Sequence, residues 1–486
     1  MSSLRTEERL ELLRDLAQMG SRGRAEGEDL GRMPRTFHPV KEHLRMLDPD
    51  VVLVVGPRGS GKTEMFRALT DASLVQEAFD ESAVRRLPQA EKTEWLKGHP
   101  LGRAGFDAAG LRRFISSRPD LDAMQELWFA YLVRLLEPHL GTGAQALDAL
   151  LDAPGGAAAQ VHDAWLAAKD EPLLALDRLD ERLENENRYV FVAYDELDVL
   201  GGSDWRAMAE GVRGLVAFWA AYARRWHRIR PKIFLRSDLF ERFATSGGAD
   251  LAKLAAGRVE LSWSDRQLYE MLLRRIANTS DRLREYIRAG RSVVSWRDHP
   301  VLGLIPALER WTDARPLIER IVGPYMGANR QKGLSYRWPL AHVRDGLGRA
   351  VPRPLVRLFE EAAHLEADSP RPVGGMRILH PSSLRRAIDV VSSEHVAHAR
   401  DEWAWIDTLK EALNGVLMPA KQRDVELRLA DASRWKAPPP YEDPRELLGY
   451  VVEVGILRER PDGRIDSPDL FLYGLGLKRK GGVGRR

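Results

Sequence analysis

Residues 51–66 read VVLVVGPRGSGKTEMF, and this stretch decides the fold that the sequence predicts. Four valines and a leucine lead into a glycine-rich turn, and TEMFRALTDA follows with helical spacing. The turn, Gly56 to Thr63, fits the pattern G-x-x-x-x-G-K-[ST] in its expected context of strand, loop and helix. Glycine is required there because phosphate oxygens approach the backbone closely, while successive N–H groups and the helix N-terminus face the anion. The stretch therefore predicts a site for a nucleoside triphosphate.

The turn supplies most of the expected binding residues. We expect Lys62 to reach the β- and γ-phosphates and Thr63 to ligate Mg²⁺, so the predicted cofactors are ATP and Mg²⁺. The alternative is a glycine-rich turn without a ligand, which the combined strand, spacing and helix disfavour. The residues expected to hold the nucleotide are Gly56, Pro57, Arg58, Gly59, Ser60, Gly61, Lys62, Thr63 and Glu64.

A second apolar segment, Tyr189 to Tyr194 in RYVFVAYDELDVL, predicts a buried strand that ends in acidic residues. Ligands of open parallel sheets bind at the carboxyl ends of the strands. We therefore expect Asp195 to ligate Mg²⁺ and Glu196 to act as the catalytic residue that polarises the attacking water. Asp198 is a candidate for an outer contact, although an ordinary surface acid is the simpler interpretation. A strand that ends in solvated acids is the alternative for the whole motif.

A third strand is predicted in PKIFLRSDLFER, after a helical stretch rich in aromatics and arginine. In P-loop ATPases with a strand between the P-loop strand and the acidic strand, a polar residue at this strand's end lies close to the γ-phosphate. Arg236, Ser237 and Asp238 occupy that position. Ser237 is the preferred candidate for sensing the phosphate and Arg236 the second. The alternative is that all three residues cap the strand.

Gly56 to Thr63, Asp195-Glu196 and KIFLRSD together resemble the AAA+ and STAND-like branch of P-loop ATPases. The chain is most similar to a bacterial family within that branch, through VELSWSDRQLYEMLLRRI, a PRP segment and DLFLYGLGLKRKGGV. The resemblance implies an α/β fold: a P-loop NTPase core whose parallel sheet is flanked by helices, with a helical insertion, a helical lid and a C-terminal winged-helix-like domain. It also implies ATP hydrolysis that drives a switch or an assembly on a macromolecular partner. A role in defence against phage is a weaker implication.

The resemblance extends to a lid. VELSWSDRQLYEMLLRRIAN predicts a short strand, Ser264 as N-cap and an amphipathic helix with Leu268, Met271, Leu272 and Ile276 on one face. Arg353 in the Pro-Arg-Pro segment matches the lid arginine that touches the γ-phosphate, or is a solvated arginine at a helix start. The arginine finger of a neighbouring subunit has no clear position. Its candidates are Arg225, Arg242 and Arg258, and a structural or solvated role is the simpler interpretation of each.

Four domains are predicted. Residues 1–36 form an N-terminal helix and linker, and residues 37–263 the ATPase core, with a helical insertion at about 75–186. Residues 264–379 form the lid and residues 380–486 the winged-helix-like domain, because helices there are followed by two strands around the turn ERPDG.

Basic clusters near the C-terminus leave the partner open between nucleic acid and protein. One is the tail with Lys478, Arg479, Lys480, Arg485 and Arg486, which suits a phosphate backbone, and another runs from Arg330 to Arg357. Against nucleic acid, Glu459 and Asp462 accompany the arginines of the hairpin, and no interleaved aromatics mark a base-stacking surface.

Composition narrows the remaining classes. The 486 residues include no cysteine, which excludes disulfides and thiolate chemistry, and the net charge is only +3. No stretch reaches about 18 uncharged apolar residues and the N-terminus does not read as a signal peptide, so we expect a cytoplasmic protein without a membrane role. A homo-oligomer or a partner protein is expected. The alternative functions are a nucleotide-gated binding or scaffold module with little turnover, and an initiator-like or loader-like ATPase on DNA.

Overall fold

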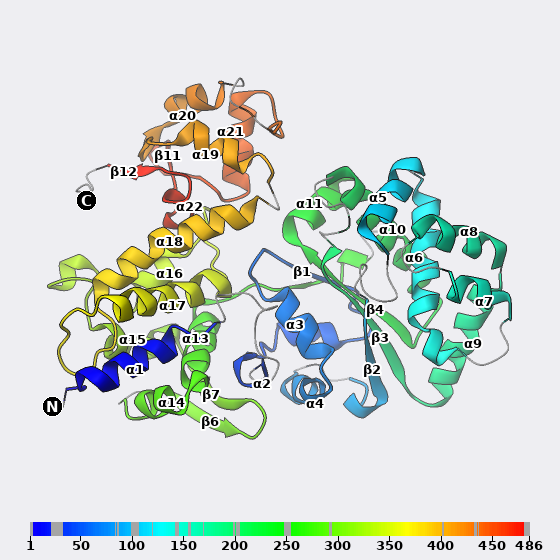
Figure 1. Ribbon diagram of the computed structural model, residues 1–486, viewed down its shortest axis with the longest axis horizontal. Coiled ribbons are helices and arrows are strands. Elements are labelled where there is room, and N and C mark those ends of the chain that lie inside the picture. Colours follow the sequence, from blue (N-terminus) through cyan, green and yellow to red (C-terminus); the bar gives the residue numbers. More distant parts are fainter. Residues whose placement is uncertain are drawn as a thin grey trace. The chain divides into compact units, whose positions relative to one another are not determined.

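The computed structural model divides the chain into two compact units, which we describe separately (Figure 1). The core unit is Pro39–Leu261, and the helical unit combines Met1–His38 with Ser262–Arg486. The structure describes residues 3–20, 33–82, 84, 87–98, 106–118, 120–140, 145–153, 157–168, 170–197, 200, 205–246, 254–290, 294–400, 403–431, 435 and 437–480.

A five-stranded parallel sheet forms the centre of the core unit, in the spatial order β2-β3-β4-β1-β5. Side chains of β3 alternate between its faces: Val190, Val192 and Tyr194 join the core cluster under the larger set of helices, and Phe191 faces the other side. Figure 1 shows helices on both sides of the sheet, which confirms the predicted α/β class. The strands are β1 Leu53–Gly56, β2 Thr93–Lys97, β3 Tyr189–Tyr194, β4 Ile229–Arg236 and β5 Val259–Glu260.

The core unit has nine α-helices within its described residues. The prediction that residues 75–186 form a purely helical insertion is wrong in one part. That region is mainly helical, but β2 lies inside it and forms an edge of the sheet, where Trp95 stacks on Phe191 with ring centroids 4.4 Å apart. TEWLK is too short and too polar to be recognised without its neighbouring strand. The helices are α3 Lys62–Leu69, α4 Ala72–Glu81, α5 Ala108–Ser117, α6 Leu121–Leu135, α7 Gln145–Leu151, α8 Ala158–Ala168, α9 Glu171–Asn185, α10 Trp205–Tyr222 and α11 Ser237–Ser246.

The helical unit contains the remaining elements. Its helices are α1 Thr6–Leu16, α2 Met33–Thr36, α13 Asp265–Thr279, α14 Asp281–Arg288, α15 Arg315–Val322, α16 Trp338–His342, α17 Pro352–Asp368, α18 Pro381–Ala399, α19 Ile406–Leu413, α20 Gln422–Leu429, α21 Pro444–Glu453 and α22 Asp469–Leu472. Its strands are β6 Ser295–His299, β7 Gly303–Ala307, β8 Leu417–Met418, β9 Ala420–Lys421, β10 Arg458–Glu459, β11 Arg464–Asp466 and β12 Lys478–Arg479.

Local signals place α13 as predicted. Ser264 is the N-cap, its hydroxyl accepts the Gln267 N–H, and the Gln267 side chain returns to the Ser264 backbone to complete a capping box. Leu268 and Leu272 are fully buried on the predicted face. The hairpin at ERPDG is also confirmed: β10 and β11 pair antiparallel, with β9 on the other side of β11.

The N-terminal helix packs into the core of the helical unit, and most of the predicted linker, residues 21–32, lies outside the described residues. Leu12, Leu13 and Leu16 of α1 belong to the unit's main core cluster. Arg9 is buried beneath them, where its guanidinium donates to Glu366 Oε1 at 2.6 Å and to the carbonyl of Ile378 at 2.8 Å. Glu366 is fully buried, so the pair stabilises α1 against α17.

Among the described helices, none has the length and apolar composition of a membrane span.

Replacing Arg9 by leucine is expected to destabilise the helical unit by about 3–5 kcal/mol, because it leaves the Glu366 carboxylate buried without its ion-pair partner. The measurement is chemical denaturation followed by circular dichroism. Arg14→Leu, on the exposed side of the same helix, is the matched control and should leave the free energy of unfolding nearly unchanged. Equal stability of the two variants would contradict this role of the pair.

Candidate functional site

Three loops meet at one edge of the core sheet. β4 lies between β1 and β3, with Gly56 in register with Arg236 and Tyr194 in register with Ile233. Since the three strands are parallel, the residues that follow them emerge at the same edge. These residues are the glycine-rich turn after β1, Asp195-Glu196 after β3, and Ser237 after β4.

The glycine-rich turn has the backbone that its sequence requires. Gly59 and Gly61 have φ of 80° and 99°, values that side chains other than glycine rarely adopt. A Cβ on Gly56 would overlap the Ser60 hydroxyl oxygen, so the loop closes more tightly than another residue would allow. The N-terminus of α3 has no side-chain cap, which leaves the backbone N–H groups of its first turn facing the loop.

Lys62, the first residue of α3, closes the turn from inside. Its ammonium donates to the carbonyls of Gly56, at 2.7 Å, and Pro57, at 3.0 Å. The ammonium charge therefore lies within the loop, where an anion held by the α3 N–H groups would also lie.

Asp195 is the buried acid of the site. Its side chain accepts a hydrogen bond from the Thr63 hydroxyl and feels the positive charge of Lys62, so the end of β3 and the start of α3 are adjacent. Burial raises the pKa of Asp195 to about 6, and a hydrogen bond from the Glu196 backbone N–H, the Lys62 charge and the Thr63 hydrogen bond only partly offset this. Its Oδ2 is buried without a hydrogen-bond partner among the described residues.

That arrangement fits a divalent cation. A buried carboxylate oxygen without a donor, next to a threonine hydroxyl, offers two oxygen ligands of the kind that Mg²⁺ uses. In the described part of the chain no cluster of three or more His, Asp or Glu side chains forms a metal site. A cation held by Asp195 and Thr63 would thus need phosphate oxygens or water as further ligands.

Glu196 has an unusual backbone. Its φ is +57°, in the left-handed region, although it is not glycine. Such a conformation costs about 1–2 kcal/mol and is found preferentially at functional sites. Because Asp195 and Leu197 on either side are buried, the turn directs Glu196 to a partly exposed position at the end of β3.

The candidates after β4 are held together. Arg236 is buried and binds Asp238 through two hydrogen bonds, of 3.1 and 2.8 Å, while Ser237 is half-buried as the first residue of α11. All three residues are predicted candidates, but the ion pair between Arg236 and Asp238 was not predicted. The spacing Arg-x-Asp at the end of the strand is the feature of the sequence that could have indicated this pair. Sensing by Ser237 or Arg236 stays a prediction.

The arginines predicted as finger or lid residues lie in several parts of the structure. Arg225 binds Asp177 at 2.8 and 2.5 Å, and Arg258 binds Glu260 at 3.0 and 2.8 Å, so both stabilise contacts within the core unit. Arg353 is the second residue of α17 in the helical unit, and its role stays a prediction. The side chain of Arg242 and all of Asp198 lie outside the described residues.

No protein-family model matches the chain, and no curated protein does. Among solved structures, the chain is similar to the Aeropyrum pernix ORC2 protein in its ADPNP-ADP complexes, with 13% identity, a TM-score of 0.38 and 89% of each chain covered. It is also similar to a Walker-type ATPase of Pyrococcus abyssi, with 14% identity, a TM-score of 0.39, and coverage of 90% of this chain and 95% of that one. For the Aeropyrum pernix ORC1 protein in complex with DNA, the values are 14%, 0.34, 96% and 90%. Similarities of this size assign no function, and the geometry of the site has to do so.

Replacing Asp195 by asparagine is expected to stabilise the core unit above pH 7 when Mg²⁺ is chelated. The native carboxyl has a pKa of about 6 against an ordinary value of 3.8, so the native state binds more protons and loses stability as the pH rises through this window. The asparagine side chain avoids that loss, on the order of 2 kcal/mol.

Thermal denaturation from pH 4 to 8 is the measurement. The stability difference between wild type and Asp195→Asn should be largest above pH 7 and close as the pH falls towards 4. Asp148→Asn, an exposed acid of the same unit, is the control. A difference that does not change with pH would show that burial of the Asp195 charge is not its cause.

Proposed function

We propose that this protein is a Mg²⁺-dependent P-loop ATPase in which bound nucleotide drives a switch or an assembly on a macromolecular partner. The observation that carries the proposal is the placement of Asp195, buried beside Thr63 and Lys62 with one carboxylate oxygen lacking a donor. A purely structural acid would be fully hydrogen-bonded or exposed, because an unpaired buried carboxylate is costly.

The residues divide the work by chemistry. The N–H groups of the loop and of α3, with the Lys62 ammonium, bind the phosphate oxygens. Thr63 and Asp195 would hold Mg²⁺, which when bound offsets the charge that develops on the phosphates. Glu196, partly exposed after the end of β3 and with a left-handed backbone, accepts a proton from the attacking water or orients it. Arg236, fixed by Asp238, or Ser237 contacts the terminal phosphate.

A nucleotide-gated scaffold with little turnover is the second candidate. It is favoured by the pairing of two of the three finger candidates, Arg225 and Arg258, with carboxylates of their own core unit. A finger arginine contributes about 10³–10⁵ in turnover, so a protein without one would hold nucleotide longer than it hydrolyses it.

We propose that residues 380–486 form a winged-helix-like domain, with its characteristic elements from α19 onward. Its support is the order helix, strand, helix, helix and hairpin, formed by α19, β9, α20, α21 and β10–β11, with the three strands in one antiparallel sheet. We also propose that the partner is another copy of the chain, another protein or nucleic acid. The suggestion of a role in phage defence rests on the sequence resemblance alone.

Glu196→Gln is expected to reduce phosphate release about 10²-fold or more while leaving ATP affinity unchanged, because the amide has the shape of glutamate but cannot take a proton. Phosphate release and calorimetric ATP titration are measured on the same protein. The control is Glu186→Gln, which changes an exposed glutamate just before the start of β3, at the other end of the strand from Glu196. Wild-type turnover in Glu196→Gln contradicts the assignment, and wild type that binds ATP without releasing phosphate favours the scaffold.

Lys62→Ala is expected to weaken ATP binding at least about tenfold, because a charge-assisted hydrogen bond to phosphate is worth about 1.5–3 kcal/mol. Chelation of Mg²⁺ should weaken binding to wild type as well. Lys41→Ala, an exposed lysine of the core unit, serves as the control in the same calorimetric titration. Unchanged heat of ATP binding in Lys62→Ala would exclude the glycine-rich turn as the site.

A further inference from the structure

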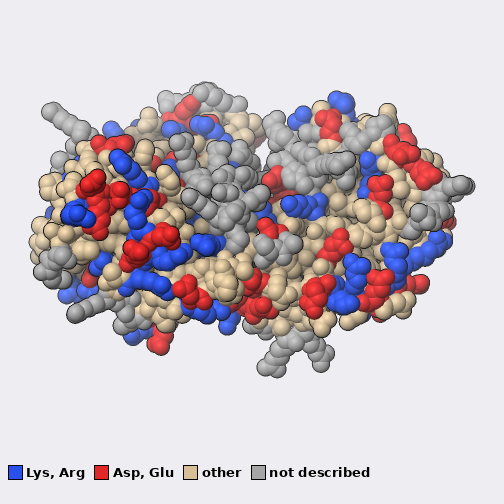
Figure 2. All heavy atoms as spheres, turned by 60° about the horizontal axis from the view of Figure 1, so that its bottom comes forward, with Lys and Arg blue, Asp and Glu red and all other residues tan. Residues whose placement is uncertain are grey.

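Basic side chains are numerous in this protein, but most lie beside acids. On the face drawn in Figure 2, lysine and arginine alternate with aspartate and glutamate, without a wide region of one sign. A polyanion would therefore be recognised by a local group of cations that have no carboxylate partners. The C-terminal run Leu-Lys-Arg-Lys contains such a group.

The run begins as a strand, β12, which covers Lys478 and Arg479. β12 pairs parallel with β8, with Lys478 opposite Leu417 and Arg479 opposite Met418. The N–H groups of Lys478 and Lys480 donate to carbonyls of the β8 region, at 3.0 and 2.9 Å. Since side chains alternate along a strand, Arg479 points to one face and both lysines point to the other.

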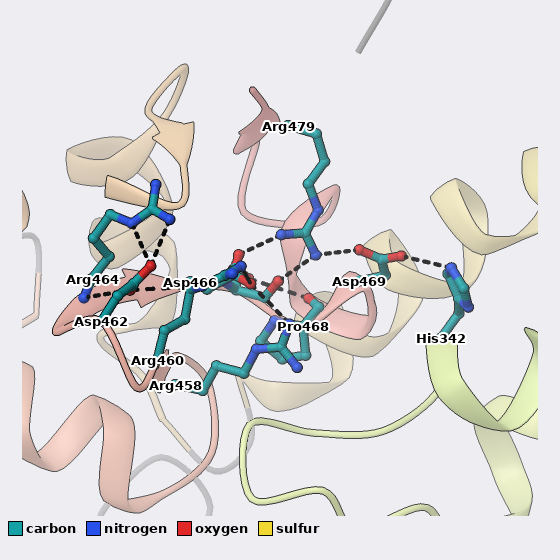
Figure 3. A network of polar contacts seen from close by, with 10 residues as sticks. His342, Arg458, Arg460, Asp462, Arg464, Asp466, Pro468, Asp469 and Arg479 are labelled. Atoms are coloured by element: carbon teal, nitrogen blue, oxygen red, sulfur yellow. Dashed lines mark hydrogen bonds and ion pairs between the residues drawn. The ribbon is translucent and has the colours of Figure 1, made fainter. Parts of the chain in front are cut away.

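Arg479 faces inward (Figure 3). Its guanidinium binds the Asp466 carboxylate, the carbonyl of Ser467 at 2.8 Å and Asp469 Oδ1 at 2.6 Å. Burial acts to raise the pKa of Asp466, but the Arg458 hydrogen bond and the charges of Arg479 and Arg458 outweigh it and hold that pKa below its usual value. Arg479 is thus a structural residue, which corrects its prediction as part of a phosphate-binding tail.

The arginines of the β10–β11 hairpin are also bound to acids. Arg458 donates to Asp466 at 2.8 Å, Arg460 lies 3.6 Å from the same carboxylate, and Arg464 donates to Asp462 at 2.6 Å (Figure 3). The exposed residues of α21 add little positive charge, because Arg445 stands beside Glu446 and the helix ends at Glu453. Neither element offers a row of unpaired cations.

Three lysines at or beside β9 and β12 are exposed and unpaired among the described residues, as are Lys410, Arg423, Arg428 and Arg445 on the helices α19, α20 and α21. Lys478, Lys480 and Lys421 are exposed, and none has an ion-pair or hydrogen-bond partner through its side chain within the described residues. Lys421 belongs to β9, which pairs with β11 in the neighbouring sheet. It is three residues from Met418, whose carbonyl accepts the Lys480 N–H, so the backbone of Lys421 lies within about 10 Å of this carbonyl. We call Lys421, Lys478 and Lys480 the lysine row.

We propose that the lysine row binds the phosphate backbone of double-stranded DNA, so that this domain contacts DNA beside β12 rather than through its hairpin and α21. Lys478 and Lys480 are separated along the strand by about 7 Å, and an extended row suits a linear series of phosphates better than a single anion. A membrane surface is a poorer match. Leu417 is the one large apolar side chain exposed on β8 and β12, and an interfacial anchor needs an apolar face.

The test is fluorescence anisotropy with a labelled duplex and the full chain, over a salt series from about 50 to 200 mM. Lys421→Gln/Lys478→Gln/Lys480→Gln is expected to lower affinity at least about tenfold and to reduce the slope of log K against log salt by about 2–3, since each phosphate contact contributes about 0.9. The control removes three exposed arginines that face carboxylates, Arg178, Arg288 and Arg310, with the same change in net charge. It should leave affinity and slope near their wild-type values.

A third variant, Arg445→Gln/Arg464→Gln, addresses the hairpin and α21 and is expected to bind like wild type. The proposal is overturned if the lysine variant binds as well as wild type, if the hairpin variant loses as much affinity as the lysine variant, or if wild type fails to bind near 50 mM salt. Binding to vesicles of equal parts phosphatidylcholine and phosphatidylserine, without binding to DNA, also overturns it. The proposal does not depend on the ATPase proposal, because ATP titration of the same variants reports on that site separately.

Discussion

The buried contact of Asp195 with Thr63 and Lys62 is the interaction on which the core unit's chemistry depends. It joins residues about 130 positions apart in sequence, and it forms because β4 separates β1 from β3 while all three strands run parallel. Its cost is visible in the raised pKa of Asp195 and in an oxygen without a donor. A cation bound to this carboxylate would compensate its buried charge and occupy the oxygen that has no hydrogen-bond donor.

Local signals explain how much of this could be predicted. The glycine-rich turn, the acids after β3 and the capping box of α13 are each specified by a few neighbouring residues, and β3 matches its predicted bounds. β1 begins two residues later than predicted, at Leu53, and the ammonium of the buried Lys232 donates to the carbonyls of Asp48 and Val51 just before it. β2 and the docking of α1 depend on partners distant in sequence, so no local pattern indicated them.

The number of charged residues in a sequence does not show which of them are paired with an opposite charge in the structure and which are exposed without a partner. In the basic stretch from Arg330 to Arg357, which predicted a surface for phosphates, Arg344 binds Asp265, Arg349 binds Asp345, and Arg357 binds Glu360 and Glu394. Arg330 and Lys332 of the same stretch are exposed, without a carboxylate partner among the described residues. The same division occurs in β12, where one strand turns Arg479 inward and its neighbouring lysines outward. Arginine's planar group suits the carboxylates of Asp466 and Asp469, whereas the strongly hydrated ammonium groups of Lys478 and Lys480 stay in water.

The connections between the units place a constraint on any nucleotide-driven switch. The helical unit is built from both ends of the chain, so the core unit is joined to it at residues 38–39 and 261–262. The second connection starts beside the phosphate loop: Leu261 donates its N–H to Val55 at 2.7 Å, and its Cβ would lie 3.0 Å from a Cβ on Gly56. A shift of this loop on binding phosphate would therefore displace the last residue of the core unit. Ser262, the first residue of this part of the helical unit, follows Leu261 directly in the chain, so the displacement reaches the connection between the units without an intervening element.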